Sequence, residues 1–93
     1  MLEVDDNRLR RLRMRSWRRG MKEMDLILGP FADGPLAALQ GDMIAQYEAL
    51  MGENDQDLYR WITARISGRD EGPEALAPLL DVIARHASDR LHG

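Results

Sequence analysis

The 93-residue sequence contains no cysteine, five aromatic residues and only two histidines. Without cysteine, a disulfide framework, a thiolate zinc site and a cysteine nucleophile are excluded. His86 and His92 are six residues apart, so on a helix they would face different directions and would not share a metal. We expect both to be cations that favour the C-terminal end of a helix dipole. A small domain of this kind must be stabilised by packing alone, most simply in a reducing compartment.

Long apolar runs are also missing. No stretch approaches the roughly 20 apolar residues of a membrane span, and no signal-like apolar run follows the acidic first residues. An arginine-rich segment after Asn7 is flanked by Glu3, Asp5 and Asp6, which is not typical of a mitochondrial presequence. The sequence therefore predicts a cytoplasmic protein that does not contact a membrane.

Groupings that carry catalysis are hard to find. Ser16, Ser67 and Ser88 have no nearby candidate base, and no predicted strand precedes a glycine as a phosphate-binding loop requires. Neighbouring acids, such as Asp70 and Glu71, fall where turns are expected and suit solvated caps. We therefore predict no catalytic residue, no metal and no enzymatic activity of the chain by itself.

Charge divides the chain into two unequal parts. Residues 1–22 hold eight cations and three acids, a balance of +5, whereas residues 23–93 hold five cations and thirteen acids, a balance of −8. Clustered arginines can neutralise phosphates of a nucleic acid. They can also pair with the acidic part of the same chain while their stems cover apolar surface, or bind an acidic protein. The sequence leaves these three interpretations open.

Apolar residues recur with a helical period throughout, which predicts an all-α fold, a compact bundle of five short helices. We expect helices from a cap at residues 5–7 to Arg19, then over about 21–31, 42–51, 55–66 and 75–91. The whole chain reads as a single domain, 1–93, with an N-terminal tail over 1–6 and a polar loop over 68–73. The predicted core residues are Leu9, Leu12, Ser16, Met24, Ile27, Leu28, Phe31, Met43, Ile44, Tyr47, Leu50, Met51, Leu58, Trp61, Ile62, Ile66, Leu76, Leu79, Leu80, Ile83, Ala87 and Leu91.

Several residues predict where the helices begin and end. Gly20 is expected to end or bend the first helix, and Gly29-Pro30 to kink or break the second near its end. Asn54 or Asp55 can cap the fourth helix, and Ser67-Gly68 can terminate it. Pro78 implies that the regular last helix begins near Ala75 or that its first turn is bent.

The densest local cluster is Arg18-Arg19-Gly20-Met21-Lys22-Glu23. In a structural interpretation Gly20 supplies a bend, Arg19 complements the end of the first helix, and Glu23 bonds back to the Gly20 amide as in a capping box. In a binding interpretation, exposed arginines lie beside Met21 and Met24, which a continued helical spacing would place near Trp17. Arginine, methionine and aromatic residues are the types that interface cores favour. The chemistry alone supports both interpretations equally.

Arg19-Gly20-Met21-Lys22-Glu23 resembles the RGxxE signature of the SdhE-type succinate dehydrogenase assembly factors, also called flavinylation factors. The segment Asp55-Gln56-Asp57-Leu58-Tyr59-Arg60-Trp61 is similar to the second block of the family, an acidic turn into a helix with a tryptophan. The resemblance covers roughly residues 8–66. It departs from the family in the turn over 33–39 and in the tail beyond Ser67. The resemblance implies a five-helix bundle of about this length.

The resemblance also implies a function. Such factors promote covalent attachment of FAD, through its 8-methyl carbon, to a histidine of the succinate dehydrogenase flavoprotein subunit, and often of the fumarate reductase flavoprotein subunit. It implies that this chain acts on the FAD of the client. We expect a monomer that holds no FAD stably, because no residue pattern in the sequence makes a flavin pocket. The resemblance places Arg19, Gly20 and Glu23 at the client interface, and the neighbouring Trp17, Arg18 and Met21 complete the predicted client-binding residues.

Distinct roles follow for three of these residues. Gly20 would allow close backbone approach, Glu23 would accept bonds from a client cation, and Arg19 would meet client acids or add positive potential near the flavin. Two alternatives stay open. The chain could be a nucleic-acid-binding or toxin–antitoxin regulatory protein that uses its arginine-rich first helix, or it could carry FAD itself.

Overall fold

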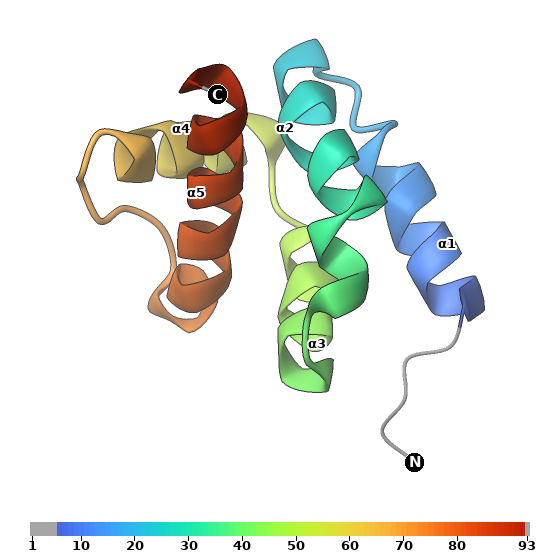
Figure 1. The fold of residues 1–93 in the computed structure, drawn as a ribbon. Coiled ribbons are helices and arrows are strands. Elements are labelled where there is room, and N and C mark those ends of the chain that lie inside the picture. Colours follow the sequence, from blue (N-terminus) through green and yellow to red (C-terminus); the bar gives the residue numbers. More distant parts are fainter. Residues whose placement is uncertain (1–5, 93) are drawn as a thin grey trace.

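The computed structural model describes the backbone of residues 6–92 and the side chains of residues 6–90. Within this range the chain forms five α-helices and two short 3-10 helices and contains no strand, so the predicted all-α bundle is confirmed (Figure 1). The elements are α1 (Asp6–Ser16), α2 (Lys22–Asp33), η1 (Pro35–Ala38), α3 (Gly41–Leu50), α4 (Asp55–Ile66), η2 (Glu74–Leu76) and α5 (Ala77–His92). The predictions for residues 1–5 and for the side chains of Leu91 and His92 lie outside the described residues.

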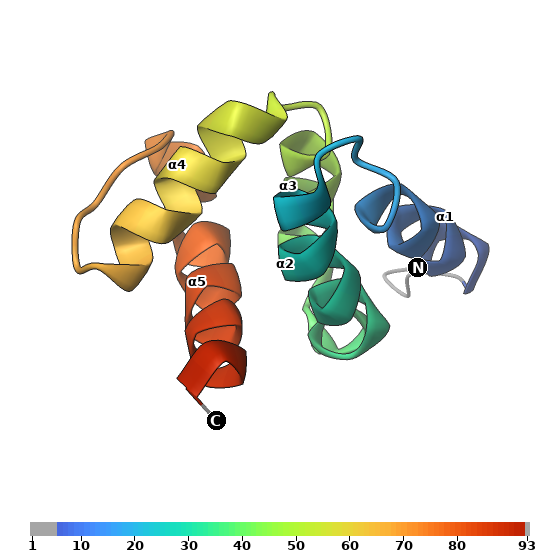
Figure 2. The same ribbon diagram turned by 90° about the horizontal axis from the view of Figure 1, so that it is seen from above.

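Helix α2 lies in the middle of the bundle, between α1 on one side and the α4–α5 pair on the other (Figure 2). Met24, Leu28 and Phe31 lie on one face of α2 at spacings of four and three, and all three are fully buried. Each such side chain contributes roughly 1.5–3 kcal/mol through burial. The α1 helix packs on α2 at the edge of the bundle, so most of its surface stays in contact with solvent.

The predicted apolar stripes form the core. The predicted residues that are buried are Leu12, Ser16, Met24, Leu28, Phe31, Ile44, Tyr47, Leu50, Met51, Leu58, Ile62, Leu76, Leu79, Leu80, Ile83 and Ala87. Leu9, Ile27, Met43, Trp61 and Ile66 pack against them and are partly buried. The sequence did not indicate η1, which follows the predicted turn at Asp33-Gly34-Pro35 and buries Leu36.

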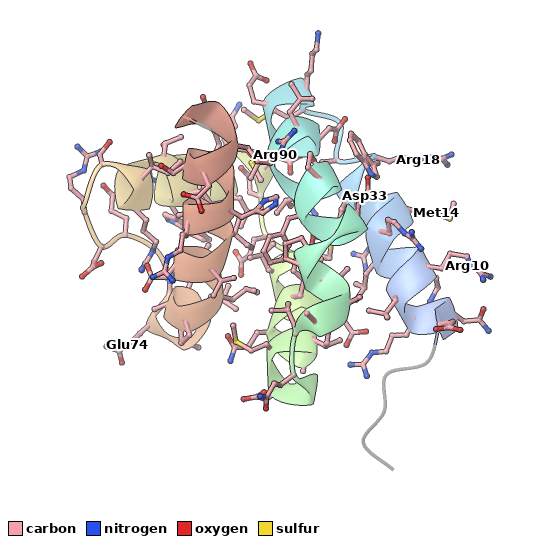
Figure 3. The ribbon with its side chains drawn as sticks, in the orientation of Figure 1. Arg10, Met14, Arg18, Asp33, Glu74 and Arg90 are labelled. Carbon is pink, nitrogen blue, oxygen red and sulfur yellow. The ribbon has the colours of Figure 1, made fainter. Side chains whose placement is uncertain are left out.

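A break in α2 at Gly29-Pro30 is not observed, because the helix continues to Asp33. Proline lacks the N–H that would bond the carbonyl four residues earlier. In α2 this carbonyl belongs to Leu26, and its oxygen accepts a hydrogen bond from Nη1 of Arg90 at 3.2 Å (Figure 3). An arginine from α5 thus supplies the donor that Pro30 removes.

The first helix ends earlier than predicted, at Ser16 rather than Arg19. The amide of Trp17 donates to the carbonyls of Arg13 and Met14, and that of Arg18 donates to Arg15, so the last turn is tightened. Beyond it the chain leaves the helix axis. The physical reason is tertiary, because the Trp17 ring lies on α2 and the Arg19 side chain reaches the end of α3.

Ser16 is the only serine, threonine, amide or charged residue of the described part of the chain that is buried. Its Oγ donates to the Leu12 carbonyl at 2.7 Å and lies 2.6 Å from Oη of Tyr47, which then donates to Ser16. Burial raises the pKa of Tyr47 to about 12. The Tyr47 ring also stacks on Phe31, with centroids 5.8 Å apart. A serine among apolar positions therefore joins α1 to α3 through a satisfied hydrogen bond.

The ends of the later helices follow the sequence closely. Asn54 caps α4, because its Oδ1 accepts bonds from the amides of Gln56 and Asp57, and Ser67-Gly68 ends the helix as predicted. The last helix begins with η2 and becomes regular at Ala77, so the turn before Pro78 is a 3-10 turn. Residues 68–73 connect α4 to η2.

The prediction that His86 is a cation at a helix end is wrong. Its ring lies edge-on to Phe31, with centroids 5.6 Å apart, and its Nδ1 is buried without a hydrogen-bond partner. Burial and nearby Arg90 lower the pKa of His86, which favours the neutral ring at pH 7. His86 is therefore part of the packing between α5 and α2.

Candidate functional site

Residues 17–21 connect α1 to α2, and we call this connection the corner. It contains most of the cluster at residues 18–23 that the sequence analysis identified. Gly20 has a φ of +93°, a conformation that side chains with a Cβ rarely adopt. A Cβ at Gly20 would meet no heavy atom within 4 Å. The fold therefore requires glycine here for its backbone conformation, and none of the described residues approaches the position of its Cβ closely. Among these residues, nothing fills the space next to the Gly20 backbone on that side.

Arg19 points inward and binds the end of α3. Its Nη1 donates to the Met51 carbonyl and its Nη2 to the Glu53 carbonyl, both at 2.7 Å. Its Nε lies 2.6 Å from Oδ1 of Asp55, at the start of α4. The Arg19 side chain is only 9% exposed. Unpaired carbonyls at a helix C-terminus favour a cation, so the guanidinium suits this place.

This geometry corrects two predictions for Arg19. It does not complement the end of the first helix, because it binds the end of α3 instead. Nor do its charged atoms face outward to meet client acids, since the guanidinium is satisfied within the chain. The position of Arg19 depends on segments more than thirty residues away in the sequence, which local pattern does not reveal.

The predicted capping box is also wrong. Oδ1 of Asp25 accepts the hydrogen bond from the backbone N–H of Arg19 at 2.8 Å, and the α2 N-cap, Met21, has no side-chain hydrogen bond. Glu23 is exposed, and its side chain takes part in no hydrogen bond or ion pair with the described residues. The acid that shapes the corner is thus Asp25, while the Glu23 carboxylate faces solvent.

The two sequence blocks of the family resemblance meet at this corner. An open hollow is lined by Gly20, Met21, Lys22, Glu23, Asn54, Asp55 and Gln56. Arg19 lies beneath it and joins its two sides, because it bonds to both Asp55 and the chain before Asn54. The hollow is mostly polar, and Glu23 and Lys22 contribute opposite charges to its rim. Such a surface suits charge-assisted hydrogen bonds to a partner.

Trp17 lies beside the corner and is fixed in place. A Cβ on Gly29 would come within 2.4 Å of its indole ring, so the ring rests directly on the α2 backbone. Its Nε1 donates to Oδ1 of Asp33 at 3.1 Å, and Asp33 lies near the end of α2 (Figure 3). The outer side of the ring leaves Trp17 40% exposed.

The remaining predicted site residues differ in exposure. Arg18 is exposed, whereas Met21 is half-buried and packs against the core. Met24, which the sequence placed near Trp17, is fully buried in the core. Sequence reasoning missed Asp25, Gly29 and Asp33. The sequence signal that could have indicated close packing at Gly29 is a glycine in the interior of a helical pattern.

Another ion pair joins α1 to the bundle. Arg8 donates to both carboxylate oxygens of Glu48 on α3, with an Nε to Oε2 distance of 2.7 Å. The hydrogen bond from Arg8 lowers the pKa of Glu48, and the charges of Arg11 and Arg15 add to this effect. One arginine of α1 therefore pairs with the acidic part of the chain, as one of the three interpretations expected.

Two features that a functional site could use are absent from the described residues. No helix among them is long and apolar enough to cross a membrane. No three histidine, aspartate or glutamate side chains in this part of the chain gather as ligands for a metal ion. The features that remain are the corner, the exposed arginines of α1 and the hollows near them.

The fold and the corner define a small helical bundle that presents a prepared surface, as a binding module does. Residues 10–87 match the model of the family Sdh5, described as flavinator of succinate dehydrogenase. Because this match covers most of the sequence, the chain belongs to that family. The predicted relationship to SdhE-type assembly factors is thereby confirmed.

Curated relatives carry corresponding names. The chain is 35% identical over 74 residues to the FAD assembly factor SdhE of Photobacterium profundum, a match that covers 80% of this chain and 81% of that protein. It is 37% identical over 68 residues to the mitochondrial succinate dehydrogenase assembly factor 2 of Penicillium rubens, across 73% of this chain. That match spans only 20% of the fungal protein. No solved structure matches the chain significantly.

Proposed function

We propose that this protein binds the flavoprotein subunit of succinate dehydrogenase and promotes covalent attachment of FAD to a histidine of that subunit. Membership of the flavinator family supports the proposal, as do the names of the relatives. The fumarate reductase flavoprotein subunit is a second proposed client. A cytoplasmic location and a monomeric state stay predictions, and the fungal relatives are named as mitochondrial.

The corner at Gly20 is the proposed client-binding site. The observation that carries this proposal is the set of bonds from the Arg19 side chain to Asp55 and to the Glu53 carbonyl. These bonds hold residues 20–23 and 54–56 together as one surface. On that surface the Glu23 carboxylate is exposed and has no partner among the described residues. An unpaired carboxylate beside an open glycine backbone is suited to bind a cationic side chain of a client.

In this proposal a bond forms between the 8-methyl carbon of the FAD of the client and a histidine nitrogen of the client. A C–H bond of the methyl group and the N–H bond of the histidine are broken, and the two electrons released reduce the flavin ring of the same FAD, so that no other oxidant is needed. The contribution of this chain is to hold the client in the arrangement that brings these two groups together. Glu23 binds a client cation, and the open space at Gly20 admits the client backbone. Arg19 is a positioning residue, because it acts through the surface that it holds. FAD stays with the client and is not bound stably by this chain, which acts without enzymatic activity of its own.

The decisive test compares two acids. Glu23→Gln removes a charge from the corner, and Glu74→Gln removes the same charge from an exposed position on η2, far from the corner (Figure 3). Covalent flavin is measured by fluorescence of the client subunit on a denaturing gel, at equal subunit abundance. We expect Glu23→Gln to lower the signal at least about tenfold and Glu74→Gln to leave it unchanged.

Gly20→Val provides a second test. At a φ of +93° a β-branched residue is strained, so unfolding must be checked by far-ultraviolet circular dichroism. If the helical signal persists and flavin attachment is lost, the corner binds the client. If cells without this gene attach flavin as well as cells with it, the proposed function is wrong.

The nucleic-acid alternative rests on the exposed arginines of α1. It requires submicromolar affinity for DNA or RNA that falls steeply as salt rises. The family match gives no support to this alternative. The affinity for DNA or RNA is therefore measured only as a control.

A further inference from the structure

The side of α1 that faces away from the bundle carries a row of exposed side chains. Arg10 and Met14 lie four residues apart on α1, and Arg18 lies just beyond the end of the helix; Figure 3 shows all three side chains pointing away from the bundle. Arg11 and Trp17 lie next to this row, and both are exposed. We call these five residues the α1 outer face.

The arginines of the α1 outer face form no ion pair with the described side chains. The one side-chain hydrogen bond of Arg10 is a 3.3 Å contact with Asn7, and Arg18 makes none in this part of the chain. Arg19, by contrast, is paired with Asp55. The charge of Arg11 acts on Glu48, which is already paired with Arg8. An acidic partner would supply the counter-charge that Arg10 and Arg18 lack among the described residues.

The α1 outer face also has an apolar centre that is already ordered. Met14 is 48% exposed and Trp17 is 40% exposed. The Trp17 ring is held by Gly29 and Asp33, so binding a partner would cost little side-chain entropy there. Next to Met14 the surface is hollowed, with Arg15, Arg18 and Arg19 completing the lining. Tryptophan and arginine are the residues that most often dominate protein interfaces.

We propose that the α1 outer face is a second docking surface, and that its partner is an acidic protein surface with an apolar side chain for the hollow at Met14. A nucleic acid would contact the arginines mainly through phosphates and would leave Met14 and Trp17 without a matching partner. Arg18 is two residues from Gly20, so one client can cover both surfaces. This inference therefore rests on the proposed function, and the acidic surface belongs to the client flavoprotein subunit.

The test measures binding to the purified client subunit. The double variant Arg10→Glu/Arg18→Glu reverses two charges on the α1 outer face. The control Arg69→Glu/Arg85→Glu makes the same change in net charge at two exposed positions after α4 and on α5. At about 50 mM salt we expect the Kd to rise at least about thirtyfold for the first variant and less than about threefold for the control.

A third variant separates apolar contact from charge. Met14→Ala should raise the Kd about fivefold at both low and high salt, because the lost contact is apolar. The difference between wild type and Arg10→Glu/Arg18→Glu should instead shrink as salt approaches about 500 mM. Circular dichroism of each variant checks that α1 remains folded.

Four outcomes would overturn the inference. Equal weakening by both double variants would mean that net charge alone matters. Unchanged binding by Arg10→Glu/Arg18→Glu, with loss of flavin attachment in Glu23→Gln, would reject the second surface and keep the proposed function. If Arg10→Glu/Arg18→Glu loses affinity for a DNA or RNA duplex while its binding to the client is unchanged, the α1 outer face binds nucleic acid instead. If the client binds neither wild type nor variants, both proposals fail together.

Discussion

Arg19 and Arg65 organise two regions of the bundle in different ways. Both side chains are almost fully buried, at 9% and 5% exposure. Arg19 bonds to two backbone carbonyls after α3 and to Asp55, which is itself only 19% exposed. Arg65 bonds to the Glu71 carbonyl and pairs with Asp70 and Asp81, whose side chains are 94% and 58% exposed.

The two arginines differ in the groups that their removal would leave without a partner. Without Arg19, carbonyls at a helix end and a half-buried carboxylate lose their partner, and the two sides of the candidate site are no longer joined. Without Arg65, the two carboxylates return to water at little cost. Equal burial of two arginines therefore does not imply an equal contribution to stability, because the environment of their acceptors decides that contribution.

The largest expected effect comes from removing each arginine in turn. Arg19→Ala should lower the free energy of unfolding by about 3 kcal/mol, because it leaves a poorly solvated acid and two carbonyls unpaired. Arg65→Ala should cost about 1.5 kcal/mol, mostly for its bond to the Glu71 carbonyl. Urea unfolding measures both. Equal losses would contradict the distinction between the two regions.

The contact between Trp17 and Gly29 allows a second comparison within the corner. Gly29→Ala should cost about 2 kcal/mol, because its Cβ would lie 2.4 Å from the Trp17 ring and must displace it. Gly52→Ala is a matched control, since the nearest heavy atom to its Cβ is 3.4 Å away. In a Trp17→Ala background the cost of Gly29→Ala should largely vanish. A cost that persists there would show that the ring is not the obstacle.

The bond between Ser16 and Tyr47 is expected to contribute less. Ser16→Ala should lower the free energy of unfolding by about 1.5 kcal/mol, because it leaves the buried Tyr47 hydroxyl unpaired. Ser16→Ala combined with Tyr47→Phe removes both groups and should cost less than the two single changes together. Thermal unfolding of the three variants measures this coupling. Additive costs would contradict a direct hydrogen bond.

The smallest effects concern pH. The lowered pKa of His86 stabilises the fold above the unfolded value of 6.5, and this contribution is lost as pH falls through the folded pKa. The lowered pKa of Glu48 contributes stability above its unfolded value of 4.5, and this contribution is lost as pH falls through the folded pKa. Its ion pair with Arg8 is about one-third exposed, so we expect less than about 0.5 kcal/mol from it. Unfolding measured between pH 7 and pH 5 should show the loss in wild type and not in His86→Leu. A pH response that survives in His86→Leu would reject this assignment.

Much of the fold could be predicted from the sequence, because its causes are local. The apolar spacing of Met24, Leu28 and Phe31 is a property of one helix, and the cap at Asn54 involves only the next three residues. The predictions failed where distant segments intervene. Helix α1 ends at Ser16 because Trp17 and Arg19 bind α2 and the end of α3. Helix α2 continues past Pro30 while Arg90 bonds to the carbonyl that Pro30 frees.

The all-α class, the core stripes and the family follow from the sequence alone, since periodicity and the motif at residues 19–23 are contained in the order of residues. Which charges of the motif face solvent depends on the tertiary structure. Arg19 points inward and Glu23 outward, although both belong to the same motif. The physical reason is that the direction of a charged side chain depends on the acceptors that folding brings near it, and those of Arg19 come from residues 51–55.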